Sequence, residues 1–202
     1  SGWSLDLGTA VVAAVAGVEK FSEGGKDELN EAVLRFVADR VRRWLTDIVE
    51  VSGDTADAVM AVGWADLPDA VARAEALEQV REAASFRSLA LAFKRVRNIT
   101  ADQPDADVDT GIFDQPEEKE LHEAATAFGE ALAGLLPEHR VEEAFAAMEP
   151  LAEVLERFFV EVLVMCENHS MRSNRIALLK ELGHEFSHLA DLSKLQVEGG
   201  EQ

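Results

Sequence analysis

Hydrophobic residues recur every three or four positions along nearly all of this 202-residue sequence, and no useful length alternates polar with apolar residues. A repeat of that length gathers apolar side chains on one face of a helix, whereas a half-buried strand needs a repeat of two. The clearest case is an apolar stripe that we expect to be buried, formed by Leu34, Val37, Val41, Trp44, Leu45 and Ile48. The sequence therefore predicts an all-α fold, a bundle of about eight to nine helices.

Breaks in this repeat delimit the expected helices. Gly24 and Gly25 separate the first two, and Asp66 followed by Pro68 marks a helix start, because Asp is a good N-cap and Pro is tolerated in the first turn. We expect helices at residues 7–21, 27–51, 55–62, 67–84, 85–100, 116–136, 141–147, 151–166 and 170–195.

The glycine pair also divides the chain into regions. Residues 1–26 are expected to form an N-terminal helical arm or the end of a preceding domain, residues 27–196 one helical domain, and residues 197–202 a disordered tail. The sequence enters in the middle of a pattern at Trp3, as expected of a fragment of a longer protein.

The single cysteine, Cys166, cannot form an internal disulfide, so a reducing compartment fits best. It follows the apolar run 160–165, where a thiol is more typical of a small core residue than of a nucleophile. The longest apolar run, residues 10–18, is far shorter than the roughly 20 residues that span a bilayer. We therefore expect a soluble, cytoplasmic protein without a membrane partner.

One helical segment is free of acidic residues although the chain is strongly acidic. The sequence has 39 Asp and Glu against 19 Lys and Arg, a net charge of −20, yet residues 85–99 contain four cations and no acid. The apolar stripe of this segment consists of Phe86, Leu89, Phe93 and Val96. Lys94, Arg97 and Asn98 lie together at spacings of three and four, so the helix can bury one face and present cations to an anionic partner.

A second acid-free segment, residues 168–180, repeats this chemistry with Arg172, Asn174 and Arg175. Guanidinium groups bind phosphate or stack on bases, and an Asn amide can hydrogen-bond a base edge. Because a net charge of −20 repels phosphate at long range, local recognition of a few unpaired bases is favoured over a long duplex. Pairing of the same cations with acids inside the protein remains the alternative.

Two further patterns suggest metals. The residues from His184 to His188 match the H-E-x-x-H motif of zinc hydrolases, but Asp191, on the same expected helix, cannot supply the third ligand that a catalytic zinc needs. Residues 100–115 carry five Asp and no cation, but they lack the Gly and terminal Glu of a calcium loop. We expect a solvated histidine pair and a solvated loop, with neither metal, and no Gly-rich phosphate loop is present.

Five blocks stand in order along the chain: AFKRVRNI at 92–99, IFDQPEEKEL at 112–121, FFVEVLVM at 158–165, RSNRIALL at 172–179 and ADLSKL at 190–195. At this order and spacing they resemble the C-terminal region of the bacterial glycyl-tRNA synthetase β subunit. The resemblance runs from about Val33 to Leu195, and the segment from Asp69 to Arg73 stands where that family has a D-A-x-x-R pattern.

The resemblance implies a helical anticodon-binding domain of the DALR type that binds tRNA(Gly). Aminoacylation would belong to the α subunit, which uses ATP and is a partner of the full-length β subunit, so no catalytic residue, cofactor, metal or DNA partner is expected here. The residues expected to contact RNA are Lys94, Arg95, Arg97, Asn98, Arg172, Asn174 and Arg175. The four cations among them other than Arg95 are expected to converge on one surface. The alternative is a helical subunit-assembly or protein-interaction domain without direct RNA contact.

Overall fold

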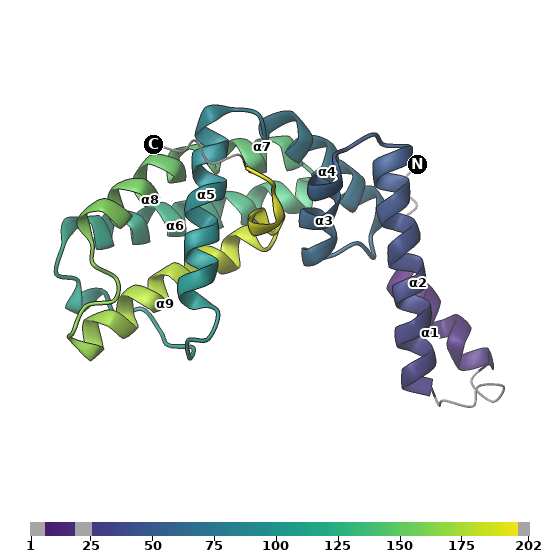
Figure 1. Cartoon of the computed structure of the whole chain (residues 1–202), viewed down its shortest axis with the longest axis horizontal. Helices are drawn as coiled ribbons and strands as arrows, with labels where there is room; N and C mark the ends of the chain where they lie inside the picture. The colour runs from purple at the N-terminus through teal and green to yellow at the C-terminus, as the bar shows by residue number, and fades with distance from the viewer. Residues whose placement is uncertain (1–6, 19–25, 198–202) are drawn as a thin grey trace.

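The computed structural model describes residues 7–18 and 26–197, and within them the chain is helical and contains no β-strand (Figure 1). The predicted all-α fold is confirmed. The helices are α1 (Leu7–Val18), α2 (Lys26–Asp47), α3 (Gly53–Val62), α4 (Leu67–Val80), α5 (Ala84–Thr100), α6 (Pro116–Leu135), α7 (Val141–Ala146), α8 (Glu149–Glu161) and α9 (His169–Phe186). Short 3₁₀ turns lie at Thr110–Ile112, Leu136–Glu138 and Leu192–Lys194.

Seven of these described helices have 12 or more residues, whereas α3 has ten and α7 has six, so the expected count of eight to nine is slightly high for the long helices. The start of α4 forms as predicted. The carboxylate of Asp66 accepts a hydrogen bond from the backbone amide of Asp69, and Pro68 lies in the first turn.

Helices α5, α6, α8 and α9 pack together in one half of the molecule, and α3, α4 and α7 continue the bundle beside them (Figure 1). Aromatic rings fill the centre of the first group. The ring of Phe186 on α9 lies 5.0 Å from that of Phe93 on α5, nearly edge to face, and 5.5 Å from that of Phe128 on α6. Three helices therefore share one buried contact.

Helix α9 is shorter than predicted. Asn168 caps its start by accepting hydrogen bonds from the amides of Ser170 and Met171, but the helix ends at Phe186 and not at Leu195. The chain then turns and runs along α3, where the amide of Asp191 donates to the carbonyl of Ala58 over 2.9 Å. The end of the chain thus closes the bundle and does not extend a helix.

Helix α8 also ends early, at Glu161, whereas residues 151–166 were expected to be helical. The chain is extended at Val162 and turns at residues 164–165, and burial alternates: Val162 and Val164 are buried, while Leu163 and Met165 are exposed. Cys166 is only half-buried, so the expectation of a core cysteine is wrong. The apolar pattern of residues 158–165, interrupted only by Glu161, does not show where the helix ends, and in the structure a turn follows α8.

Helices α1 and α2 pair and project from the end of the molecule beside α3 (Figure 1). The apolar stripe predicted on α2 is only partly buried. Val41 and Leu45 are buried, but Trp44 is 37% and Ile48 is 67% exposed. Residues 198–202 of the expected tail lie outside the described residues, and Val197 packs against the core. Within the described residues no helix is both long and apolar enough to cross a membrane.

Candidate nucleic-acid interface

Helix α5 buries and exposes the faces that its sequence predicts. Phe86, Leu89, Phe93 and Val96 are all buried, with Phe93 against the ring of Phe186. The remaining turns expose basic and amide groups to solvent, and no acidic residue lies between Ser85 and Ile99. This helix therefore exposes basic residues, with Leu91 between them, while its other side is fixed in the core.

The polar residues of this face keep most of their hydrogen-bonding capacity. Lys94 is half-buried and Asn98 exposed, and neither makes a side-chain hydrogen bond or ion pair within the described part of the chain. The guanidinium of Arg97 lies 3.8 Å from the carboxylate of Asp191, but its side chain is 59% exposed. Asp191 is only 13% exposed, but at 3.8 Å and with most of Arg97 in water the contact is weak, so Arg97 remains available to an anion.

Arg95 is held differently, because its guanidinium carbon lies 4.2 Å from the centre of the Phe159 ring on α8. Phe159 was not among the residues expected to matter, although it belongs to the FFVEVLVM block. Phe158 and Phe159 are adjacent and equally apolar, so the helical repeat alone does not show which of them faces α5. In the structure Phe158 is buried and Phe159 half-buried.

The basic residues of α9 are placed less favourably for a shared surface. Arg172 is half-buried and donates a hydrogen bond to the carbonyl of Cys166 over 3.0 Å. Gly183, eleven residues later on α9, is the position that faces Val96 of α5. Eleven residues correspond to about 16 Å along the helix, so Arg172 lies well away from the cations of α5.

Arg175 is buried and cannot lie on an RNA-binding surface in this fold. Its side chain is 2% exposed and donates two hydrogen bonds, of 3.0 and 3.1 Å, to the carboxylate of Glu118, which is 1% exposed. A third bond reaches the carbonyl of Leu163 over 3.1 Å. The expectation that Arg175 shares a surface with Lys94, Arg97 and Arg172 is therefore wrong, and the internal pairing left open by the sequence applies to it.

Glu118 is the buried partner that the sequence did not reveal, since acidic residues are so abundant. Burial disfavours its charged form, but hydrogen bonds from Arg175 and from the backbone amides of Asp114 and Gln115 outweigh burial and hold the pKa of its carboxyl below the usual value. The hydrogen bonds that Arg175 donates to Glu118 raise the pKa of Arg175. The ion pair therefore stays charged over the ordinary pH range.

We expect acid to destabilise the protein partly through Glu118. Its pKa is lower in the folded chain than in the unfolded one, so its contribution is complete above roughly pH 4.3 and is lost as the pH falls through the folded value. Between about pH 6 and pH 3 the parent chain should lose more free energy of unfolding than a Glu118→Gln variant. Urea denaturation at several pH values measures this, and parallel curves would show that Glu118 does not contribute.

The side chain of Asn174 also makes its hydrogen bonds within the protein. Its side-chain carbonyl accepts from the amide of Asp109 over 2.7 Å, and its amide group donates to the carbonyl of the same residue over 3.0 Å. Lys180, one and a half turns later, donates to the carbonyl of Gln103 and to the carboxylate of Asp105. The segment 101–115 is therefore tied along α9 and is not the simple solvated loop that was expected.

The D-A-x-x-R segment supports the fold. Arg73 is 4% exposed and its Nε lies 2.7 Å from the carboxylate of Asp69. Its remaining donors reach the carbonyls of Val59, Gly63 and Leu189, which belong to α3, its end, and the segment after α9. This arginine thus joins three separate parts of the chain and has no free group for a ligand.

The H-E-x-x-H residues do not lie on one helix, because α9 ends at Phe186 before His188 is reached. His184 and His188 are exposed, with ring centres 5.1 Å apart. Across the described residues, no three His, Cys, Asp or Glu side chains are grouped as a metal site would require.

Curated relatives of this chain are bacterial proteins named glycine–tRNA ligase β subunit. The protein of Acidobacterium capsulatum is 34% identical over 175 residues, which cover 82% of this chain and 25% of the relative. That of Anaeromyxobacter dehalogenans is 36% identical over 207 residues, covering 100% of this chain and 29% of the relative. That of Geotalea daltonii is 32% identical over 194 residues, covering 96% and 28%. The chain spans less than a third of the length of these relatives.

A family model described as the DALR anticodon binding domain matches residues 89–194. The match begins on α5, five residues before Lys94, and ends at the 3₁₀ turn that follows α9, so it contains every residue expected to contact RNA. It leaves out α1, α2, α3 and α4, and with α4 the D-A-x-x-R segment. Because the match covers more than half of the 202 residues, the chain belongs to the DALR anticodon-binding domain family.

Proposed function

We propose that this chain is the anticodon-binding part of a glycine–tRNA ligase β subunit and that it binds the anticodon arm of tRNA(Gly). The observation that supports this most directly is the family match over residues 89–194, which begins on the helix whose exposed face is basic and free of acids. The names of the relatives supply the amino acid, since they are glycine–tRNA ligase β subunits.

The proposal places the chemistry of the ligase outside this chain. We infer that the α subunit carries out ATP-dependent glycylation, and that the full-length β subunit brings this domain and the α subunit together in the cytoplasm. No catalytic residue and no cofactor is assigned to this chain. Its part is to bind one arm of the tRNA so that the other end can reach the catalytic subunit.

Within the proposal, the RNA-facing residues are Lys94, Arg97 and Asn98 on α5, with Arg95 beside them, whereas Arg172 lies apart from this patch on α9. Asn174 and Arg175 are left out, because their polar atoms are already bonded to Asp109, Glu118 and Leu163. A small patch of this kind on a chain of net charge −20 suits a few nucleotides better than a long duplex.

Substituting Lys94 or Arg97 with alanine should weaken binding of the tRNA(Gly) anticodon stem-loop without unfolding the domain. If the residue contacts a phosphate, each substitution should lower the slope of log Kd against log salt by about one unit. Fluorescence anisotropy titrations at about 50 mM and about 200 mM salt measure both the affinity and this slope.

Arg140→Ala provides the matched control. Arg140 is an exposed arginine inside the matched family segment, but Glu143 and Glu138 bind its guanidinium at 2.6 and 3.0 Å. It should bind the stem-loop as the parent does. If Lys94→Ala and Arg97→Ala also bind with unchanged affinity and salt slope, then α5 does not contact the RNA.

A subunit-assembly domain is the second candidate, and the exposed apolar residues of α2 favour it. Phe36 and Trp44 on α2 are 53% and 37% exposed, and Ile48, directly after the helix ends at Asp47, is 67% exposed. Aromatic residues and arginine are enriched at protein interfaces, and Arg40 and Arg43 lie nearby. The same RNA titration separates the two candidates, because an assembly domain would bind the stem-loop no better than an unrelated RNA hairpin.

A further inference from the structure

Arg95 and Phe159 form a stacked pair at the edge of the basic face of α5. The guanidinium carbon of Arg95 lies 4.2 Å from the centre of the Phe159 ring, a distance typical of a cation over an aromatic face. The Phe159 ring in turn meets that of Phe158 edge to face, with centres 5.7 Å apart. Phe158 is completely buried, so the ring beneath Arg95 is anchored in the core.

The second face of the Arg95 guanidinium is open to another flat group. Arg95 is exposed, and no carboxylate pairs with it anywhere in the described ranges 7–18 and 26–197. A planar group that rests on a ring has used one of its two faces, and the ring also limits the conformations of the long side chain. Binding a second flat group on the open face therefore costs less ordering than it would for a free arginine.

We propose that Arg95, supported by Phe159, is the platform on which one unpaired base of the RNA stacks. Unpaired bases in RNA loops stack on arginine planes and on aromatic rings, and this stacking tolerates any base. Asn98 follows one turn later on α5 with its amide unpaired in the described structure, so it can hydrogen-bond the edge of a base placed there. This inference rests on the proposed binding of the anticodon arm.

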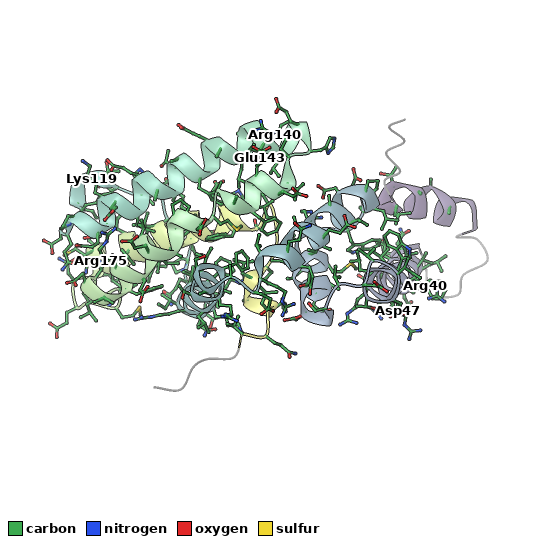
Figure 2. The ribbon with its side chains drawn as sticks, turned by 90° about the horizontal axis from the view of Figure 1, so that it is seen from above. Arg40, Asp47, Lys119, Arg140, Glu143 and Arg175 are labelled. Atoms are coloured by element: carbon green, nitrogen blue, oxygen red, sulfur yellow. The ribbon has the colours of Figure 1, made fainter. Side chains whose placement is uncertain are left out.

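The chain contains a second pair of the same kind, which serves as a control. On α2 the guanidinium of Arg40 lies 3.2 Å from the centre of the Phe36 ring, and Phe36 is 53% exposed. Figure 2 shows Arg40 at the opposite end of the molecule from Arg175, and it lies outside the matched segment 89–194. Asp39 and Asp47 are exposed on the same helix, so this pair lacks the acid-free surroundings of Arg95.

The test is a thermodynamic cycle between protein and RNA variants. Each nucleotide of the tRNA(Gly) anticodon loop is replaced in turn by an abasic one, and the Kd of each stem-loop is measured for the parent, Phe159→Leu, Phe159→Tyr and Phe36→Leu. For one loop position we expect the abasic nucleotide to weaken binding to the parent about tenfold. The same nucleotide change should have little effect on the Kd of Phe159→Leu. Phe159→Tyr, which keeps a ring, and Phe36→Leu should behave as the parent does.

The outcomes are distinct. If the parent binds the stem-loop and no loop position is coupled to Phe159, the stacking platform is wrong while the proposed function stands. If Phe159→Leu lowers the salt slope by about one unit, Arg95 holds a phosphate and not a base, which also overturns the platform. If the parent does not bind the stem-loop at all, the proposed function and the platform fail together.

Discussion

Replacing Arg175 with alanine is expected to lower the free energy of unfolding by about 3–5 kcal/mol, because it leaves the buried carboxylate of Glu118 without its partner. The carbonyl of Leu163 loses its donor as well. Urea denaturation near pH 7, followed by circular dichroism, measures the change.

Two comparisons identify the unpaired charge as the cause. Arg140→Ala removes an exposed arginine that also binds two carboxylates, and it should change stability very little (Figure 2). In a Glu118→Gln background, Arg175→Ala should cost much less than in the parent, because no charge is left buried. An equal cost in both backgrounds would mean that lost packing, and not the unpaired carboxylate, destabilises the variant.

Arg73→Ala should have an effect of similar size, about 3–5 kcal/mol, because this buried guanidinium bonds four groups at once. Its removal leaves the carbonyls of Val59, Gly63 and Leu189 without this donor. A buried polar group left unpaired costs about 1–3 kcal/mol. Urea denaturation followed by circular dichroism measures this loss of stability.

Arg73→Lys is the matched variant for this position. Lysine keeps the charge, but its single ammonium group cannot reproduce the planar arrangement of guanidinium donors, so an intermediate loss is expected. A Lys variant as stable as the parent would show that charge alone matters. A stable Ala variant would show that the segment after α9 holds to α3 without this arginine.

Sequence periodicity predicted the buried and exposed faces of α5 correctly, because one side of this helix is apolar and the other is basic. Phe86, Leu89, Phe93 and Val96 recur at three and four and are all buried, while the cations between them face outward. The same reasoning failed for α9, in which every residue from Asn174 to Leu179 is buried. A helix enclosed on all sides has no polar face, so its cations and amides must be satisfied inside the protein.

The sequence could not predict which residues far apart in the chain pair with each other. Glu118 is one of 39 acidic residues, and although its place three residues after Gln115 fits a helix-capping role, nothing in the local sequence pairs it with Arg175. Likewise, Trp44 and Ile48 continue a regular apolar stripe, yet they stay exposed while Val41 and Leu45 of the same stripe are buried. A pattern shows which residues favour burial, but only the packed chain shows which of them are covered.

The ties between the segment 101–115 and α9 also constrain the order in which the protein folds. Lys180 and Gln103 are 77 residues apart in the chain, and Asn174 and Asp109 are 65 apart. Contacts of such separation form only after a large loop has closed, and closing it costs entropy before any contact is gained. We therefore expect residues 103–109, which these bonds tie to α9, to become ordered after α9 has docked. A nascent chain in which α9 is incomplete contains the basic helix α5, but the connection that follows α5 is not yet held in place.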